Sequence, residues 1–490
     1  MILVLVIIIT IIRRYIISTI TEIKSFLEIS YDQLEEMNLQ AAKLTNGELA
    51  KETHLKYLKH EKKLKAVTIC FSDIEGRLHM LDYDKHYFIN SYNNLTFDGS
   101  SIRGFSMQNE SDLRLDVDWT SWMWLPSDVF GSGKVIMFAS VLTLTRKVYS
   151  SDFRSRLKEV SQKLYDKEKL QVLMGPEIEG FLLESIDAEQ EFDEKIGFKL
   201  ISSGGYYHSL PLDKLRKFID ATAEAQRAMG FGNEKDHPEV APSQFEINFS
   251  PAEVVRACDL VQLYKLVCRQ IANNMGMTAT FLPKPVQNIN GSGMHTNLSI
   301  SKNGTNTFYD KKGADNLSKS AWDFINRLLH HAPELCLILN PSVNAYRRLD
   351  PYFEAPNQIK VSANDRGSMV RIPSGNEKSA RIEVRSIAPD ANPYMALFAI
   401  IKTGLATEKL PNETGKSRLR YLPGTITDAI RIFKSSNYIL DILGDDEREK
   451  FANQKQLSAD RCPKELGKSI KSPEVLYHHE VTNQEIWNRF

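Results

Sequence analysis

Polar side chains, among them Glu, His and Arg, alternate with apolar ones in four short segments of the chain. The segments span residues 177–184, 244–249, 294–300 and 381–385. Residues i and i+2 of a β-strand share one face, so each segment would present its charged groups to the same side. A sheet with one solvated face is the ordinary explanation for a single strand of this kind. Four such strands, all rich in Glu, His or Arg, favour a shared site instead.

The residue types in these segments and just before one of them suggest a specific chemistry. The acidic and imidazole set comprises Glu177, Glu179, Glu239, Glu246, Glu383 and His295. If the carboxylates converge in one cavity, they cannot all stay ionised without compensating cations. Oxygen-rich sets of this kind suit Mg²⁺ or Mn²⁺, and nearby arginines suit carboxylate or phosphate oxygens. Metal ions with arginines indicate phosphoryl transfer. The GxxxxGK[ST] motif is absent, so we expect no Walker-type loop.

Composition narrows the function classes. The 490 residues include 62 Lys and Arg against 62 Asp and Glu, so the net charge is zero. This balance excludes binding to nucleic acid or acidic lipid through the overall charge of the protein. The five cysteines form no CxxC pair. A disulfide framework or a zinc–thiolate site is therefore not expected, and a cytoplasmic location fits best.

The chain begins with an apolar run, Ile2–Ile12, which is followed by Arg13 and Arg14. A membrane-spanning helix needs roughly 18 apolar residues, and a secretory signal carries its positive charge before the apolar stretch. We therefore do not expect a membrane protein. Three interpretations of this run stay open: a mis-assigned start or poorly ordered extension, a weak membrane anchor, and a helix that packs between molecules.

Three regions follow from the patterning of the chain. Residues 1–65 form an N-terminal extension, apolar and then helical, with a break at Asn46-Gly47. Alternating residues near 67–71 and 78–80 predict a hairpin that opens a small β-rich domain over 66–147. Residues 151–490 predict a larger unit of strands and helices.

Local signals place three helices in the larger unit. An amphipathic helix is predicted over Asp213–Met229, ending before Gly230. Ser250-Pro251-Ala252-Glu253 matches a capping box with Pro at the first helical position, so it predicts that a helix begins there and runs to Met275. A third helix is predicted over Leu317–His331.

Five blocks of the sequence resemble glutamine synthetases of the type I class, which is found in bacteria and archaea. They read FDGSSIRGF (97–105), GPEIEGFLLE (175–184), NEKDHPEVAPSQFEINF (233–249), NGSGMHTNLSI (290–300) and a long block over 340–394. The resemblance runs from about residue 67 to 490. It implies an α+β fold, with an N-terminal β-grasp domain and a catalytic domain of curved antiparallel sheet with flanking helices, as in glutamine synthetases and guanido kinases. It also implies a dodecamer of two hexameric rings with active sites between neighbouring subunits.

The resemblance implies ATP-dependent ligation of ammonia to L-glutamate through γ-glutamyl phosphate, with two or more Mg²⁺ or Mn²⁺ ions. Two other hypotheses are a γ-glutamyl ligase for polyamines or other amines, and a non-catalytic member of the fold. Retention of the Asp98–Ser101 loop and of Glu354 favours ammonia. Retention of all six implied metal ligands argues against a non-catalytic role.

The resemblance assigns roles position by position. One metal would be held by Glu179, Glu239 and Glu246, and a second by Glu177, His295 and Glu383. Glutamate would be bound by Asn290, Gly291, His295, Arg348 and Arg385. ATP would be contacted by Glu234, His237 and Ser299, with Arg366 and Arg371 facing its phosphates. Ammonium would be handled by Asp98 and Ser101 of a neighbouring subunit and by Glu354 of a closing flap.

Four positions leave questions open. Tyr352 stands where the family commonly has a flap glycine, and Asn297 stands where some members have His. Arg381 fits equally well as a phosphate ligand or as a partner of the site carboxylates. Tyr421 falls near a tyrosine that some relatives adenylylate, but its surroundings favour an ordinary surface residue.

Overall fold

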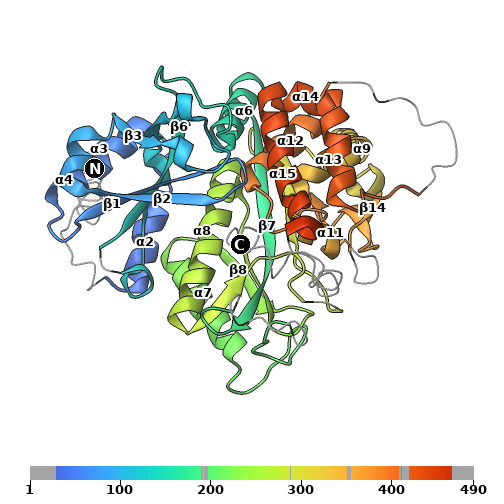
Figure 1. The fold of residues 1–490 in the computed structure, drawn as a ribbon, viewed down its shortest axis with the longest axis horizontal. Helices are drawn as coiled ribbons and strands as arrows, with labels where there is room; N and C mark the ends of the chain where they lie inside the picture. The colour runs from blue at the N-terminus through green and yellow to red at the C-terminus, as the bar shows by residue number, and fades with distance from the viewer. Residues whose placement is uncertain are drawn as a thin grey trace, which may run out of the picture.

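The computed structural model describes residues 29–131, 133–188, 191, 197–286, 288–349, 355–407, 410 and 419–465, with side chains to 460. Figure 1 shows the N-terminal strands on one side, the long strand β7 near the middle and the C-terminal helices on the other side. The described residues form two sheets, one of six strands and one of ten, with helices packed on them. The predicted α+β fold class is confirmed.

The first sheet has the order β2-β1-β6-β4-β3, and β5 pairs with β6. β1 pairs antiparallel with β2, which confirms the predicted hairpin, and it pairs parallel with β6. The strands are β1 (Ala66–Ser72), β2 (Leu78–Asp84), β3 (Leu95–Asp98), β4 (Asp112–Val117), β5 (Met123–Trp124) and β6 (Val135–Leu142). The short helices are α4 (Lys85–Ser91) and α5 (Ser127–Phe130).

Two helices precede this sheet, α2 (Tyr31–Ala41) and α3 (Gly47–His60), and the break between them agrees with the predicted one. The Asn46 side chain caps α3 by accepting a hydrogen bond from the Leu49 amide at 3.0 Å. The buried Asn38 amide donates to the Trp124 carbonyl at 3.0 Å and to the Ala228 carbonyl at 2.8 Å. α2 therefore connects the first sheet with the larger unit. The apolar run Ile2–Ile12 lies outside the described residues.

The second sheet has the order β14-β15-β16-β12-β7-β9-β8, with β10 and β11 on β7 and β13 on β12. The 15-residue strand β7 pairs with four other strands and so organises the sheet. The strands are β7 (Leu170–Glu184), β8 (Asn233–Pro238), β9 (Gln244–Phe249), β10 (Ala252–Glu253), β11 (Met277–Thr280), β12 (Met294–Lys302), β13 (Thr305–Asn306), β14 (Gln358–Ser362), β15 (Ser368–Arg371) and β16 (Ile382–Val384).

Helices cover the apolar face of this sheet. Met174 and Ile178 of β7 are buried in the main core, and Tyr264 of α8 donates its hydroxyl to the Ile178 carbonyl at 3.0 Å. The opposite face carries Glu177 and Glu179, because neighbouring residues of a strand alternate between faces. The helices are α6 (Phe153–Glu168), α7 (Lys214–Ala228), α8 (Val254–Asn274), α9 (Lys319–His330), α10 (Ala332–Leu339), α11 (Val343–Arg348), α12 (Pro393–Gly404), α13 (Ile426–Ser435), α14 (Asn437–Leu443) and α15 (Asp445–Glu465).

The predicted start of helix α8 is wrong. Ala252 and Glu253 belong to β10 and pair with Met174 and Leu173 of β7, and the helix begins at Val254. The Glu253 carboxylate caps it by accepting from the Val255 amide at 2.9 Å. Pairing with a strand distant in sequence outweighed the local capping signal. The other two helices occur close to their predicted limits, as α7 and α9.

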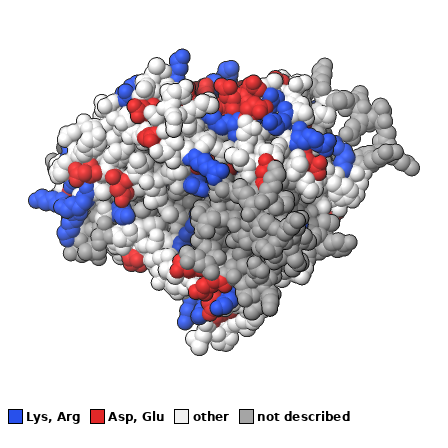
Figure 2. All heavy atoms as spheres, viewed as in Figure 1, with Lys and Arg blue, Asp and Glu red and all other residues white. Residues whose placement is uncertain are grey.

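The surface of the described residues carries both signs of charge side by side, as Figure 2 shows for one face. This arrangement fits a chain with equal numbers of acidic and basic residues. Within the described ranges, every helix is too short or too polar to cross a lipid bilayer.

Candidate active site

The register of the second sheet gathers its polar side chains on one face. His295 of β12 lies opposite Glu177 of β7. Further along β7, Glu179 lies opposite Glu246 of β9, which in turn lies opposite His237 of β8. Directly paired residues point to the same face of a sheet. Side chains from four strands and nearly 120 residues of sequence therefore meet.

Polar side chains continue along the same face toward the other edge of the sheet. Asn297 of β12 lies opposite Glu383 of β16, and Glu383 lies opposite Arg371 of β15. A cavity of about 260 Å³ opens over this face. Its lining comprises Glu177, Glu179, Tyr206, Lys235, His237, Glu239, Val240, Gln244, Glu246, Asn290, Gly291, His295, Arg348, Ala355, Pro356, Arg366, Arg371, Arg381 and Arg385.

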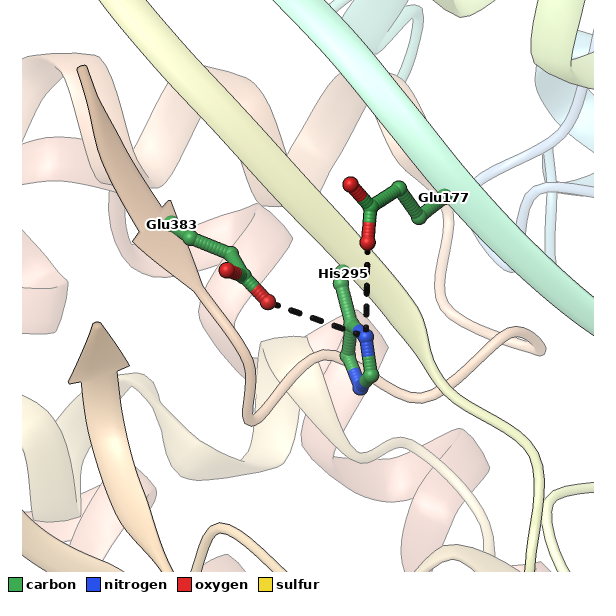
Figure 3. Close-up of side chains that lie close together, drawn as sticks. All are labelled: Glu177, His295 and Glu383. Atoms are coloured by element: carbon green, nitrogen blue, oxygen red, sulfur yellow. Dashed lines mark ion pairs between the residues drawn. The ribbon is translucent and has the colours of Figure 1, made fainter. Parts of the chain in front are cut away.

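Glu177, His295 and Glu383 form the first compact group of metal-ligand atoms (Figure 3), with one such atom from each within 4.8 Å of the others. His295 Nδ1 lies 4.0 Å from Glu177 Oε2 and 3.8 Å from Glu383 Oε1. These distances exceed those of hydrogen bonds. Ligand atoms that share an ion at about 2.1 Å lie roughly 3 to 4 Å apart. The group therefore has the spacing that a divalent ion requires.

His237, Glu239 and Glu246 form a second group of the same kind. His237 Nδ1 lies 3.8 Å from Glu239 Oε1, and its Nε2 lies 3.6 Å from Glu246 Oε1. This Nε2 is buried and has no hydrogen-bond partner among the described residues, so its lone pair is available to a ligand. Glu179 takes no part in this compact group, and its Oε1 lies 3.9 Å from His295 Nδ1.

In four of these carboxylates, a neutral donor holds one oxygen. The donor–acceptor pairs are Asn297 Nδ2 to Glu177 Oε1 at 3.1 Å, the Gly293 amide to Glu179 Oε2 at 2.8 Å, the Val240 amide to Glu239 Oε2 at 2.8 Å, and Asn248 Nδ2 to Glu246 Oε1 at 2.7 Å. Donors of this kind orient ligand carboxylates and fix which oxygen faces the metal.

Burial and mutual repulsion make this cluster electrostatically demanding. Burial, with the nearby Glu239 charge, raises the pKa of Glu179 to about 8. Burial raises the pKa of Glu246 well above its usual range, and Glu179, Glu177 and Glu239 add to the shift. Burial and the surrounding arginines lower the pKa of His295, so its imidazole is neutral and can act as a ligand. The cluster thus favours either bound protons or bound cations.

Arginines compensate the carboxylates at one end of the site. The fully buried Glu383 accepts from Arg385 Nη1 at 2.6 Å and from Arg371 Nε. Arg348 Nη2 donates to the Arg385 carbonyl at 2.9 Å. Burial lowers the pKa of Arg348 to about 10, so it stays charged at neutral pH. This end of the cavity is cationic and suits an anionic ligand.

Two glycines allow the backbone to approach the site closely. A Cβ atom on Gly291 would lie 2.5 Å from the Pro283 carbonyl oxygen and 3.0 Å from Arg348 Cγ. A Cβ atom on Gly293 would lie 2.5 Å from Arg348 Nη2 and 2.7 Å from His295 Nε2. Any larger residue at either position would displace the groups around it.

The remaining candidates from the sequence lie elsewhere. Glu234 is exposed on β8, and Ser299 is half-buried on β12; neither lines the cavity. Asp98, the last residue of β3 in the first sheet, and Ser101 are exposed, and hydrogen bonds from Ser100 and then Ser101 lower the pKa of Asp98. Glu354 lies outside the described residues.

Three polar lining residues were not among the site residues expected from the sequence. Lys235 lies two residues before His237 on β8, so the alternation used for other strands could have indicated it. Gln244 donates to the Gly291 carbonyl at 3.1 Å and shares the polar face of β9. Tyr206 lies in a loop without periodicity, so no pattern could have indicated it.

Comparisons with known proteins identify relatives of both parts of the chain. The sequence model described as "Glutamine synthetase, beta-Grasp domain" matches residues 63–144, and "Glutamine synthetase, catalytic domain" matches residues 150–468. A glutamine synthetase from Thermotoga maritima is 34% identical over 81% of this chain and 93% of its own length. One from Staphylococcus epidermidis is 35% identical over 82% and 92%.

Solved structures show the same fold. Plasmodium falciparum glutamine synthetase superposes with a TM-score of 0.75 at 20% identity, covering 84% of this chain and 96% of that one. GmaS in complex with ADP superposes with a TM-score of 0.69 at 25% identity, covering 84% and 95%.

Metal binding should depend on pH. Because the folded-state pKa of Glu179 is raised to about 8, the metal-free folded state binds more protons than the unfolded state from about pH 5 to 8. Its stability should therefore fall as pH rises through this window. Mg²⁺ requires ionised carboxylates. We expect Mg²⁺ to raise the melting temperature more at pH 8 than at pH 6, measured by calorimetry against a chelator. In Glu179→Gln, the difference between the Mg²⁺ effects on the melting temperature at pH 8 and at pH 6 should be smaller. An equal Mg²⁺ effect at both pH values in the unsubstituted protein would contradict the prediction.

Gly293→Ala should disturb the site without unfolding the sheet. The added methyl group would push His295 and Arg348 apart, so Mn²⁺ affinity should fall about 10- to 100-fold in titration calorimetry, as it does when groups that orient ligands are lost. Gly47→Ala is the control, because nothing lies within 4 Å of its added Cβ. Wild-type affinity in Gly293→Ala would show that this close approach is unimportant.

Proposed function

This chain belongs to the glutamine synthetase family, and from that premise we propose that it ligates ammonia to the γ-carboxylate of L-glutamate at the expense of ATP. The observation that carries the proposal is the cavity in which two carboxylate–histidine groups lie beside a set of arginines. A site for phosphoryl transfer onto a carboxylate needs both features, because every reactant is anionic.

The two groups fit divalent metal ions. Glu177, His295 and Glu383 would hold one ion, and Glu239 and Glu246 would hold the other, with His237 or Glu179 completing the set. Bound Mg²⁺ or Mn²⁺ would neutralise phosphate oxygens and hold them for transfer. The raised pKa values of Glu179, Glu239 and Glu246 support this fit, because these groups favour a cation over the empty state.

The arginines suit the anionic parts of the substrates. Arg348 and Arg385, beside Asn290 and Gly291, would bind glutamate, while Arg366 and Arg371 would face the phosphates of ATP. An oxygen of the γ-carboxylate would attack the terminal phosphorus, and ADP would leave. Guanidinium groups that offer several donors in one plane are suited to holding both partners in line.

Ammonia would then attack the acyl carbon of γ-glutamyl phosphate, and inorganic phosphate would leave. Ammonium is the main form of ammonia at neutral pH, so a carboxylate must take up a proton. Asp98 and Glu354 are proposed for this role. Tyr206, which lines the cavity, is an aromatic residue of the kind that suits a small cation.

The placement of Asp98 supports an oligomer in which sites are shared. Asp98 is exposed in the first sheet and does not line the cavity of its own chain. We propose that the exposed Asp98–Ser101 loop completes the cavity of a neighbouring subunit in a dodecamer of two rings. The alternative is that this protein is a γ-glutamyl ligase that uses a polyamine or another amine in place of ammonia. In either case, the amine would be selected at this loop.

Substrate choice can be tested directly. Purified full-length protein with ATP, Mg²⁺ and glutamate should release phosphate and form glutamine when ammonium is added. Methylamine and putrescine should support far lower rates at equal concentration. The amide products should be identified by mass spectrometry alongside phosphate release. Turnover with an organic amine but not with ammonium would replace this proposal with the amine-ligase alternative.

The shared-site proposal predicts complementation. Asp98→Asn should raise the KM for ammonium with little effect on ATP binding, and Arg371→Met should lower kcat about 100- to 1,000-fold. At an ammonium concentration well below the raised KM, subunits of the two variants, mixed and reassembled, should recover activity, because about one quarter of interfaces would carry both native residues after random mixing. Mixtures no more active than either variant alone would place Asp98 outside the neighbour's site.

A further inference from the structure

Asn297 lies between a cavity arginine and a proposed metal ligand, in contact with both. Its Nδ2 donates to Glu177 Oε1 at 3.1 Å, and its Oδ1 accepts from Arg381 Nε at 2.9 Å. The residue is 8% exposed, so little water competes for these bonds. Both polar ends of the amide are therefore used within the described structure.

The sheet dictates this contact. Asn297 lies directly opposite Gly175 of β7, and Glu177 is two residues further along the same face. Gly175 has no side chain, so Asn297 can reach diagonally to Glu177. Diagonal neighbours across a strand pair lie about 7 to 8 Å apart, a distance that two extended side chains can span together.

The contact determines which oxygen of Glu177 is available. Asn297 occupies Oε1, and the other oxygen, Oε2, lies 4.0 Å from His295 Nδ1 in the compact group with Glu383. We propose that Asn297 is a positioning residue, which holds the Glu177 carboxylate in the orientation that binds the divalent ion. This inference rests on the proposed metal site.

A side-chain amide combines the required properties at this position. It donates to the anionic Glu177 and accepts from the cationic Arg381 without adding charge of its own. An aspartate would place a second carboxylate against Glu177, and a leucine of similar volume would make neither bond. Arg381 in turn fixes the amide orientation, because its guanidinium can only donate and so selects Oδ1. The pair therefore acts as a relay from the cavity wall to the metal ligand.

Metal titration of the protein without nucleotide tests the inference. In Asn297→Leu, the Kd for Mn²⁺ at one of two sites should rise about 10- to 100-fold, as found when groups that orient ligands are removed, while the other site changes little. In steady-state assays, the Mg²⁺ concentration for half-maximal rate should rise more than kcat falls. Thr296→Val is the matched control, because Thr296 is a buried neighbour on the same strand with its side chain on the opposite face.

A double-variant cycle separates the relay from the charge of Arg381. Arg381→Met removes a positive charge near the metal site. The loss of this charge should favour metal binding, and by the same factor whether Asn297 is present or not. If Arg381 acts through Asn297, the combined change in Kd in the double variant will differ from the product of the two single changes. Multiplicative changes would overturn the relay.

Unchanged Mn²⁺ affinity in a folded Asn297→Leu protein would overturn the inference. If that variant does not fold, Asn297→Val, which suits a strand better and offers neither hydrogen bond, decides by the same measurement. The Mn²⁺ affinity of the Asn297 variants can be measured independently of the substrate assay. A wild-type protein that makes glutamine while Asn297→Leu binds Mn²⁺ normally would refute only this inference. A metal effect of Asn297→Leu without glutamine formation by the wild type would refute only the proposed function.

Discussion

The structure depends on one electrostatic constraint: several carboxylates share a buried face of one sheet and repel one another. Burial and repulsion raise the pKa values of Glu179, Glu239 and Glu246, so the charged cluster is stable only beside cations. At one end the protein supplies these itself, since Arg371 and Arg385 both contact Glu383. At the other end, Glu246 is met by a neutral amide and a histidine whose pKa is lowered. The charge of Glu246 is therefore not balanced by an arginine in the way that the charge of Glu383 is.

The fold meets this constraint through strand pairing. β7 places Glu177 and Glu179 on the polar face, and its apolar residues pack against helix α8 behind it. Because its partners are antiparallel and in fixed register, His295 and Glu246 arrive opposite these two carboxylates. Neutral donors on the same strands and loops then orient the oxygens. Burial of apolar side chains on one face of the sheet stabilises the fold. This stabilisation offsets the cost of burying carboxylates on the other face.

The sequence predicted the strands of the site because alternation is a local signal. Glu177, His295 and Glu383 meet as one group, which the family resemblance implied. The second group contains His237, which the resemblance had linked with ATP, while Glu179 lies opposite Glu246 and also 3.9 Å from His295 Nδ1. Its composition depends on the register between β8 and β9, which no local pattern specifies. The start of α8 was missed for the same reason, since Ala252 pairs with a strand far away in sequence. The loop residue Tyr206 had no periodic neighbours to indicate it.

Anomalous X-ray diffraction from crystals containing Mn²⁺, glutamate and a non-hydrolysable ATP analogue tests the central claim most directly. The account predicts two manganese peaks in each site. One should lie among Glu177, His295 and Glu383, and the other beside Glu239 and Glu246, with the nucleotide phosphates between the ions and the arginines. A cavity that binds the nucleotide without any manganese peak near these carboxylates would contradict it.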